Sequence, residues 1–373
     1  MRYKKHPFVQ INILLFIIIA ACTSGPSIVV DTLPQYDELF SNQEGWTGAD
    51  GAYSVALTQN TTAWLFGDTW IGQVKDGRHM NAMLVNNSVA IQHGRSPAQA
   101  EMDFHFGHAG DGSPAALMRP ADGRGWFWLF DGVMTAEGLY LFLIQVERTA
   151  GDSVFGFKVI GAWLGHVENP GELPSAWRVR QSKIPWSDFA VSGNFVWGSA
   201  VLQIDKVLYI YGTIEDVGST VRQKHMILAR VPVSRLADYS RWRFYSDGSW
   251  VSDFKKASRL SGNMPHEYSV SYLAALKQYV VVYSQDGLSK NILVRLSALP
   301  QGPWSDPLRI YQCPEAAWDD SIFCYAAKAH AILSQAPDQL IITYVANSVD
   351  FDKTANDARL YRPRFLRATF SSH

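Results

Sequence analysis

The chain has 373 residues, of which 47% are hydrophobic and 18% are charged; this composition excludes intrinsic disorder and is sufficient for one large domain. The 33 Lys and Arg residues nearly balance the 34 Asp and Glu residues, so no net field attracts a polyanion and we expect no nucleic-acid partner. Aromatic residues make up 13% of the chain, including 13 Trp, which favours surfaces for ring-shaped ligands.

The N-terminus has the pattern of an export signal, with a basic start and then an apolar run from Ile13 to Ala21. This run is shorter than the roughly 20 apolar residues that span a bilayer. It ends in Ile19-Ala20-Ala21-Cys22, which resembles the bacterial lipobox, where the cysteine is acylated before cleavage. A plain secretory signal is the alternative, but it leaves a free cysteine at the cleavage site. We therefore predict a signal peptide over residues 1–21 and a lipoprotein anchored through Cys22 in the bacterial cell envelope, on the outer membrane or facing the periplasm in a Gram-negative host.

The rest of the chain is predicted to be all-β. Short runs of β-branched and aromatic residues alternate with Gly, Asn, Asp and Pro, and hardly any stretch has a helical period. We expect a tether and a closing strand over residues 22–45. No linker-like composition follows, so residues 46–373 are predicted to form one domain.

Five repeating units can be aligned along this domain. A Trp opens the outermost strand of three of them at nearly constant spacing, at Trp177, Trp242 and Trp304. Such a period predicts a five-bladed β-propeller in which each blade is a four-stranded sheet. Only four units are complete. We therefore expect the segment from Ile28 to Phe40 to supply the outer strand of the last blade and to close the ring, which removes the sheet edges.

Acidic residues are predicted to open three inner strands, which all start at one end of the central channel. They are Asp50, Asp131 and Glu267. A pair of carboxyl groups flanking one bond, one as acid and one as base or nucleophile, is the requirement for glycosidic cleavage. Asp50 and Asp131 each precede a glycine, and an Asp-Gly pair is equally typical of a simple turn. Glu267 has no turn role, although it can serve as a binding group alone.

Other polar and aromatic side chains are predicted to reach the same channel mouth and to contact a substrate. They are Asp68, Asn87, Trp197, Tyr268, Tyr325, His330 and Asn347. Two alternatives remain open for members of this set. His330 can be a hydrogen-bonded core histidine, and Asn87 can form a turn with Asn86.

Cys313 and Cys324 are predicted to form a disulfide, because an exported chain meets an oxidising compartment. Two separately buried thiols are the alternative. A zinc site would need more ligands at suitable spacing. The chain also lacks a phosphate-binding loop and a nucleophile elbow. We expect a monomer without a cofactor or a catalytic metal, and leave open a structural calcium ion.

Several motifs together resemble a bacterial family of five-bladed propeller domains long catalogued as of unknown function, some members of which are endo-D-arabinanases. These motifs are Gly45-Trp-Thr-Gly-Ala-Asp-Gly-Ala-Tyr-Ser54, Trp64-Leu-Phe-Gly-Asp-Thr-Trp70, Val85-Asn-Asn-Ser88, Tyr325-Ala-Ala-Lys-Ala-His330 and Tyr361-Arg-Pro-Arg-Phe365. More distantly, the layout is similar to the arabinanase, xylosidase and invertase superfamily. The resemblance implies that Asp50 is the base or nucleophile and Glu267 the acid. It also implies that Asp131 or Asp68 replaces the third carboxylate, which that superfamily carries on its third blade.

We therefore predict a lipid-anchored glycoside hydrolase that cleaves a furanose-containing, arabinan-like or related polysaccharide. The alternative is a non-catalytic carbohydrate-binding lipoprotein that uses the same channel mouth. A third class, a protein-interaction scaffold, would carry apolar patches on the ring face in place of clustered carboxylates.

Overall fold

The computed structural model describes residues 25–97, 99–149, 156–187, 189, 193–216 and 223–371. Cys22 and the predicted signal peptide lie outside these residues. The predicted all-β class is confirmed, because most of the regular structure is strand and the two α-helices are short, α1 (Pro34–Asp37) and α2 (Phe351–Asn356). In the part of the chain that the structure describes, no helix is long and apolar enough to cross a membrane.

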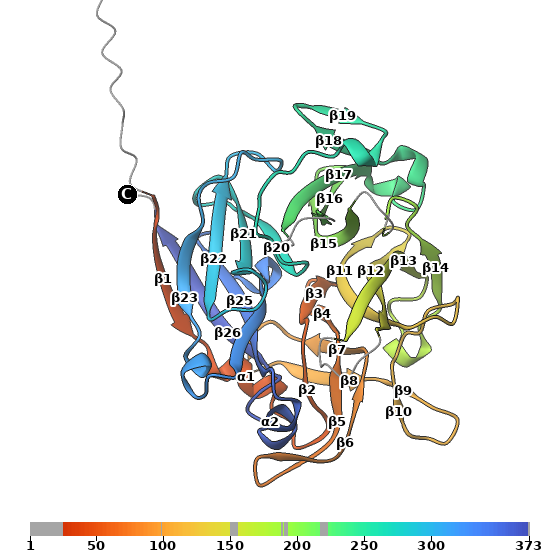
Figure 1. Cartoon of the computed structure of the whole chain (residues 1–373), viewed down its shortest axis with the longest axis vertical. Coiled ribbons are helices and arrows are strands. Elements are labelled where there is room, and N and C mark those ends of the chain that lie inside the picture. The colour runs from red at the N-terminus through yellow and green to blue at the C-terminus, as the bar shows by residue number, and fades with distance from the viewer. Residues whose placement is uncertain are drawn as a thin grey trace, which may run out of the picture.

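Five antiparallel sheets of four or five strands follow one another along the chain (Figure 1). The first contains β3 (Tyr53–Ala56), β4 (Thr61–Phe66), β7 (Ser88–His93) and β8 (Glu101–His105). The second contains β11 (Trp126–Thr135), β12 (Gly138–Arg148), β13 (Phe157–Val167) and β14 (Val179–Lys183). The third contains β15 (Asn194–Ile204), β16 (Val207–Glu215), β17 (Lys224–Pro232), β18 (Arg243–Ser246) and β19 (Ser249–Val251).

The fourth sheet contains β20 (Tyr268–Leu273), β21 (Gln278–Ser284), β22 (Asn291–Ser297) and β23 (Leu308–Gln312). The fifth contains β24 (Ile322–Ala329), β25 (Gln339–Ser348), β26 (Pro363–Ser371) and, at its outer edge, β1 (Ser27–Thr32). Two smaller sheets are formed by β2 (Glu44–Ala49), β5 (Thr69–Lys75) and β6 (Arg78–Val85), and by β9 (Gly107–His108) and β10 (Pro114–Ala115). Single 3₁₀ turns are η1 (Glu38–Phe40), η2 (Pro174–Ala176), η3 (Val233–Arg235), η4 (Tyr239–Arg241), η5 (Phe254–Lys256), η6 (Pro314–Ala317) and η7 (Ala331–Leu333).

Strand β1 joins the two ends of the described chain. It pairs antiparallel with β26, from Ser27 opposite Ser371 to Thr32 opposite Leu366. Only the first part of the predicted donor segment from Ile28 to Phe40 is therefore a strand, and its remainder forms α1 and η1.

The first strands of the five sheets are neighbours in chain order: β3 lies beside β11, β11 beside β15, β15 beside β20, and β20 beside β24. Figure 1 shows β3, β11, β15 and β20 around the middle of the molecule. Side chains also link the sheets at this level. Asp131 Oδ2 on β11 accepts a hydrogen bond from the Val201 N–H on β15 at 2.7 Å. Ser54 Oγ on β3 lies 2.7 Å from His330 Nδ1, directly after β24.

The predicted starts of three inner strands were wrong. Asp131, Trp197 and Tyr325 lie inside β11, β15 and β24, each beside a β-bulge, whereas Asp50 and Glu267 do precede β3 and β20. A bulge inserts an extra residue and reverses the alternation of faces beyond it. The pattern read downstream of each bulge therefore could not be extended to the true start of the strand.

Much of the aromatic content that we associated with ligand surfaces belongs to the core. Trp46, Trp64, Trp197 and Trp242 are all fully buried. The rings pack mostly in tilted or edge-to-face pairs, as in Trp197 against Trp242 with centroids 6.3 Å apart. Composition alone did not distinguish rings that fill the sheets from rings that line a cavity.

Cys313 and Cys324 form a disulfide in the structure, with their Cα atoms 6.7 Å apart. Cys313 directly follows β23 and Cys324 lies in β24, so the bond ties the fourth sheet to the fifth. We expect its loss to lower the free energy of unfolding by roughly 2 to 3 kcal/mol on the chain-entropy account. Urea unfolding of the oxidised protein and of a Cys313→Ser/Cys324→Ser variant measures this. Equal midpoints, or free thiols at both positions in oxidised, unfolded protein, would contradict the prediction.

Candidate active site

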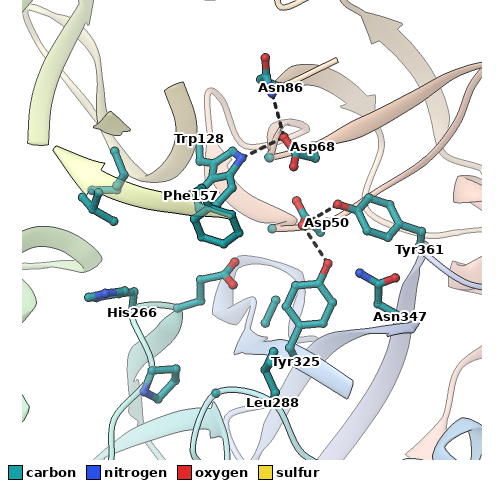
Figure 2. A pocket seen from close by; sticks show the side chains of 18 of the residues that line it. Asp50, Asp68, Asn86, Trp128, Phe157, His266, Leu288, Tyr325, Asn347 and Tyr361 are labelled. Atoms are coloured by element: carbon teal, nitrogen blue, oxygen red, sulfur yellow. Dashed lines mark hydrogen bonds between the residues drawn. The ribbon is translucent and has the colours of Figure 1, made fainter. Parts of the chain in front are cut away.

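A cavity of about 820 Å³ opens at the end of the inner strands where Asp50 and Glu267 precede β3 and β20. Figure 2 shows its polar side chains converging from several sheets. Four acidic residues line it, Asp50, Asp68, Glu267 and Asp286, and the first three are described below. Its aromatic walls are formed by Trp70, Trp126, Trp128, Phe157, Phe323, Tyr325, Phe351 and Tyr361. Rings beside acids are the surroundings that a sugar substrate requires.

Asp50 lies directly after β2 and is held by two phenols. Its Oδ2 accepts hydrogen bonds from the hydroxyls of Tyr325, at 2.8 Å, and Tyr361, at 2.9 Å. Burial raises the pKa of Asp50 well above its usual range, and the charges of Asp68 and Glu267 raise it further, while the two phenols oppose the shift. A base or nucleophile, the role expected for Asp50, has to be ionised, and hydrogen-bond donors favour that form. The hydrogen bonds are present, but the pKa shift has the opposite direction.

Asp68 lies in the turn between β4 and β5, beside Asp50. The backbone N–H of Asp50 donates to the Asp68 carbonyl at 3.1 Å, and the Gly67 N–H donates to the Asp50 carbonyl at 3.1 Å. Asp68 Oδ1 accepts the indole N–H of Trp128 at 2.9 Å and the amide of Asn86 at 3.3 Å. Burial raises the pKa of Asp68 to about 6, against the effect of these two neutral donors and of the Arg148 charge. Asp68 therefore lies beside Asp50, and its charge is one of the causes that raise the pKa of Asp50.

Glu267 differs from both aspartates because it has a cationic partner. Its Oε1 lies 3.6 Å from Nζ of Lys328, which is itself buried. Burial raises the pKa of Glu267, and the Lys328 ammonium opposes that shift. Of these three carboxyl groups, only Glu267 has a Lys or Arg nitrogen within 4 Å in the described structure, whereas the hydrogen bonds described for Asp50 and Asp68 come from neutral side chains.

The backbone around Asp50 is strained. Among the described residues, ten other than glycine have a positive φ, and seven of these are Asp, Asn or Lys. The remaining three are Ala52 (φ 51°), Ala326 (φ 56°) and Tyr361 (φ 60°). All three lie at Asp50 or at the tyrosines that donate to it. Such conformations cost of order 1–3 kcal/mol each and cluster at functional sites.

The family described as a domain of unknown function, DUF5005, matches residues 34–369. The chain belongs to this family. The predicted resemblance to a bacterial family of that kind is thereby confirmed. No curated protein matches the chain.

The first of the following solved structures shares the fold of this DUF5005 chain, and the other two are matched at lower scores. One is described as a "putative hydrolase from Bacteroides ovatus ATCC 8483"; it is 19% identical, the match covers 93% of this chain and 92% of that one, and the TM-score is 0.71. The catalytic domain of a Coprinopsis cinerea GH62 α-L-arabinofuranosidase is 11% identical, with coverage of 88% and 98% and a TM-score of 0.48. An exo-1,5-α-L-arabinanase from a bovine ruminal metagenomic library is 12% identical, with coverage of 89% and 99% and a TM-score of 0.46.

Five of the residues predicted from the sequence do line the cavity of the DUF5005 domain: Asp50, Asp68, Glu267, Tyr325 and Asn347. Asn347, at the end of β25, accepts hydrogen bonds on Oδ1 from Thr354 Oγ1 at 2.8 Å and from the Ser348 N–H at 2.7 Å. These contacts orient its amide group at the cavity wall.

Asn87 and Trp197 do not reach the cavity, so their predicted contacts with a substrate were wrong. The Asn87 amide is fully buried and donates to the carbonyls of Met118 and Phe127, each at 2.9 Å. Its neighbour Asn86 lines the cavity instead. Trp197 is buried, and its indole N–H donates to the Trp186 carbonyl at 3.0 Å.

Tyr268 and His330 are structural as well. The Tyr268 hydroxyl is buried and donates to the Gly212 carbonyl at 2.8 Å. His330 lies between Ser54 Oγ and Thr343 Oγ1, each 2.7 Å from one ring nitrogen. Burial lowers the pKa of His330 well below its usual value, so the ring is neutral. The open alternative of a hydrogen-bonded core histidine is the one observed.

Asp131 faces a different part of the channel. It lines a second cavity of about 430 Å³, formed by all five inner strands. Both of its oxygens accept backbone N–H groups, from Gly132 at 2.8 Å and Val201 at 2.7 Å. Burial raises the pKa of Asp131 to about 7. It therefore bridges two inner strands, and its predicted place among the catalytic carboxylates was wrong.

Sequence reasoning did not select Asn86, Trp128 and Tyr361, which line this cavity, or Lys328, which lines the second one. The alternation of Trp126 and Trp128 on one strand was a usable signal, because both rings line the cavity. The described residues contain one group of three potential metal ligands, Cys313, Glu315 and Cys324, and the disulfide occupies both sulfurs. This group is therefore not a metal centre.

Proposed function

We propose that this DUF5005 domain is a glycoside hydrolase with Asp50 and Asp68 as its catalytic carboxyl groups. The observation that carries the proposal is that their adjoining turns place both carboxyl groups in one aromatic-walled cavity. Two neighbouring carboxyl groups, one protonated and one ionised, supply the acid and the base that glycosidic cleavage needs. The furanose-containing, arabinan-like substrate class rests on the motif resemblance.

Within the pair, Asp68 is the acid and Asp50 the base or nucleophile. Two phenol hydroxyls donate to a single oxygen of Asp50, and such donors favour the charged carboxylate. When Asp68 is protonated, it carries no negative charge that would oppose ionisation of Asp50. Protonated Asp68 then donates to the leaving glycosidic oxygen, while Asp50 attacks the anomeric carbon or activates water.

This proposal moves the acid role away from Glu267. An acid must be protonated before the reaction, and the Lys328 ammonium at 3.6 Å favours the charged form of Glu267. Glu267 then contributes negative charge beside Asp50 and accepts hydrogen bonds from substrate hydroxyls.

The proposal extends to the architecture and the location. The five sheets would be the blades of a five-bladed propeller, and pairing of β1 with β26 supports closure of the ring by the N-terminal strand. Acylation of Cys22 would anchor the enzyme to the membrane of the cell envelope as a monomer. Intact-mass analysis of protein from its native host tests the acylation.

The test of function is hydrolysis of defined glycans by the purified protein. We expect oligosaccharide products from plant arabinan or mycobacterial arabinogalactan, detected as new reducing ends and by mass spectrometry. An Asp50→Asn variant, prepared in parallel, controls for contaminating enzymes. Glycan binding by both proteins without products would favour the carbohydrate-binding alternative, and products from fructan alone would overturn the arabinan assignment.

A further inference from the structure

Lys328 is the one Lys or Arg side chain that is buried among the residues the structure describes. It lies on β24, and its side chain is 1% exposed. A buried ammonium group is unfavourable unless charges and hydrogen bonds compensate for its lost hydration. Its contacts therefore show which groups compensate for burying the charge of Lys328.

The ammonium group has three N–H donors and three partners. It donates to the carbonyl of Gly51 and, at 2.8 Å, to the carbonyl of Ala326. The third partner is Glu267 Oε1, at 3.6 Å. The ring of Tyr53 lies beneath it, with the centroid 4.3 Å from Nζ, as in a cation–π contact.

These partners adjoin the groups that hold Asp50. Gly51 follows Asp50 in the chain, and Ala326 follows Tyr325, which donates to Asp50. The ammonium group thus binds the backbone next to each of the two residues, Asp50 and Tyr325, that form this hydrogen bond. One of these carbonyls belongs to Ala326, which has a positive φ, and the other belongs to Gly51, which precedes the positive-φ residue Ala52.

The surroundings of Lys328 are predominantly acidic. The charges of Glu267, Asp50 and Asp131, from the segments of the first, second and fourth sheets, all favour its protonated form, whereas burial lowers its pKa. Tyr53 on β3 faces it with a neutral ring, and His330 close by on the chain is uncharged. Lys328 is therefore the only cation in contact with this group of carboxylates in the described structure.

We propose that Lys328 is the positioning residue of this cavity, fixing the turn that carries Asp50 and the carboxylate of Glu267 in one arrangement. This inference rests on the proposed glycosidase function. Lys328 acts through Asp50 and Glu267 and does not itself transfer a proton to the substrate. A purely structural role is the competing explanation, because Lys328 itself lines the second cavity and reaches the first through its contacts with Gly51, Ala326 and Glu267.

The test uses three variants of the full chain. Lys328→Met keeps the length of the side chain and removes its charge and donors. Lys328→Gln keeps amide donors for the two carbonyls but removes the charge, and it carries the test where Lys328→Met does not fold. Lys158→Met is the matched control, because it removes an exposed ion pair with Glu147, 3.1 Å long, outside the cavity.

We expect both Lys328 variants to lower kcat at least about 10-fold with KM within about threefold, because geometry is lost in the reacting complex. Loss of the cation also raises the pKa of Glu267 and of Asp50. The acidic limb of the profile of kcat/KM against pH should therefore move upward by about one unit. Lys158→Met should change neither quantity.

Carboxyl ¹³C NMR separates this inference from the proposed function. The Glu267 resonance, assigned with Glu267→Gln, should titrate at higher pH in Lys328→Gln than in the wild type, whether or not the protein hydrolyses a glycan. Wild-type protein without hydrolase activity would remove the proposed function alone. An unchanged Glu267 titration, or an unchanged pH limb with only a lower melting temperature, would overturn the role of Lys328.

Discussion

Replacing Asp50 or Asp68 by asparagine is expected to lower kcat by at least about 10²-fold while leaving glycan affinity within a few-fold. The amide has nearly the shape of the carboxyl group and can still take part in the neighbouring hydrogen bonds. It cannot act as a base or a nucleophile at position 50, or donate the acidic proton at position 68. Rates on the most active glycan and affinities from calorimetry measure the two effects separately.

The pH dependence of the catalytic activity distinguishes the acid, Asp68, from the base, Asp50. Activity should fall as pH rises through the pKa of Asp68, about 6, because the acid loses its proton. It should also fall as pH drops through the pKa of Asp50, because the base gains one. In Asp68→Asn the acidic proton is absent at every pH. The alkaline limb near pH 6 should then be absent from the pH profile of the residual activity.

Glu267→Gln is the matched comparison for these variants. We expect it to reduce kcat less than Asp68→Asn does, since its carboxylate is charged beside Lys328 and is not the acid. A larger loss in Glu267→Gln than in Asp68→Asn would return the acid role to Glu267. Wild-type hydrolysis by Asp50→Asn would remove Asp50 from the mechanism.

The second prediction concerns Gly67, which precedes Asp68. A Cβ atom added at Gly67 would meet a carboxylate oxygen of Asp50, and the backbone of Gly67 does not require a positive φ. Gly67→Ala should therefore fold and displace the Asp50 carboxylate from its two phenol donors. We expect kcat to fall about 10²-fold, because a misplacement of about 1 Å at a reacting group costs that much.

Gly171→Ala is the control, because nothing lies within 4 Å of a Cβ atom built there. It should match the wild type in both kcat and melting temperature. Gly67→Ala should differ from the control in kcat far more than in melting temperature. A Gly67→Ala enzyme with wild-type kcat would mean that the position of the Asp50 carboxylate does not limit the reaction.

The parts of the fold that are periodic could be predicted from the sequence. Alternating residues predicted the strands, and the expected positions of Asp50, Asp68 and Glu267 at strand ends placed them at one end of the inner strands. The same reasoning failed for Asp131 and Trp197, because bulges inside β11 and β15 interrupt the alternation of residues, and β24 contains a bulge of the same kind. Asn86, at the cavity, and Asn87, which is buried, are adjacent in the chain. The alternation of residues along a strand does not show which of two such neighbours faces the cavity.

The donors to Asp50 illustrate what local patterns cannot supply. Tyr361 lies far from Asp50 in sequence and reaches it only because the fifth sheet lies beside the first. Lys328 is a charged residue on an inner strand, which predicts an exposed position until the carboxylates around it are known. Both contacts depend on the tertiary arrangement and have no signature within a single strand.

If Cys22 is acylated as proposed, the pairing of β1 with β26 would limit how far the molecule can move from a membrane. Four residues separate Cys22 from the start of β1 at Ser27, so these two residues lie at most about 17 Å apart. The acyl group would then hold the outer edge of the fifth sheet near the bilayer surface. An enzyme tethered at that distance would not reach far into the glycan layer, and its polysaccharide would have to come to the membrane.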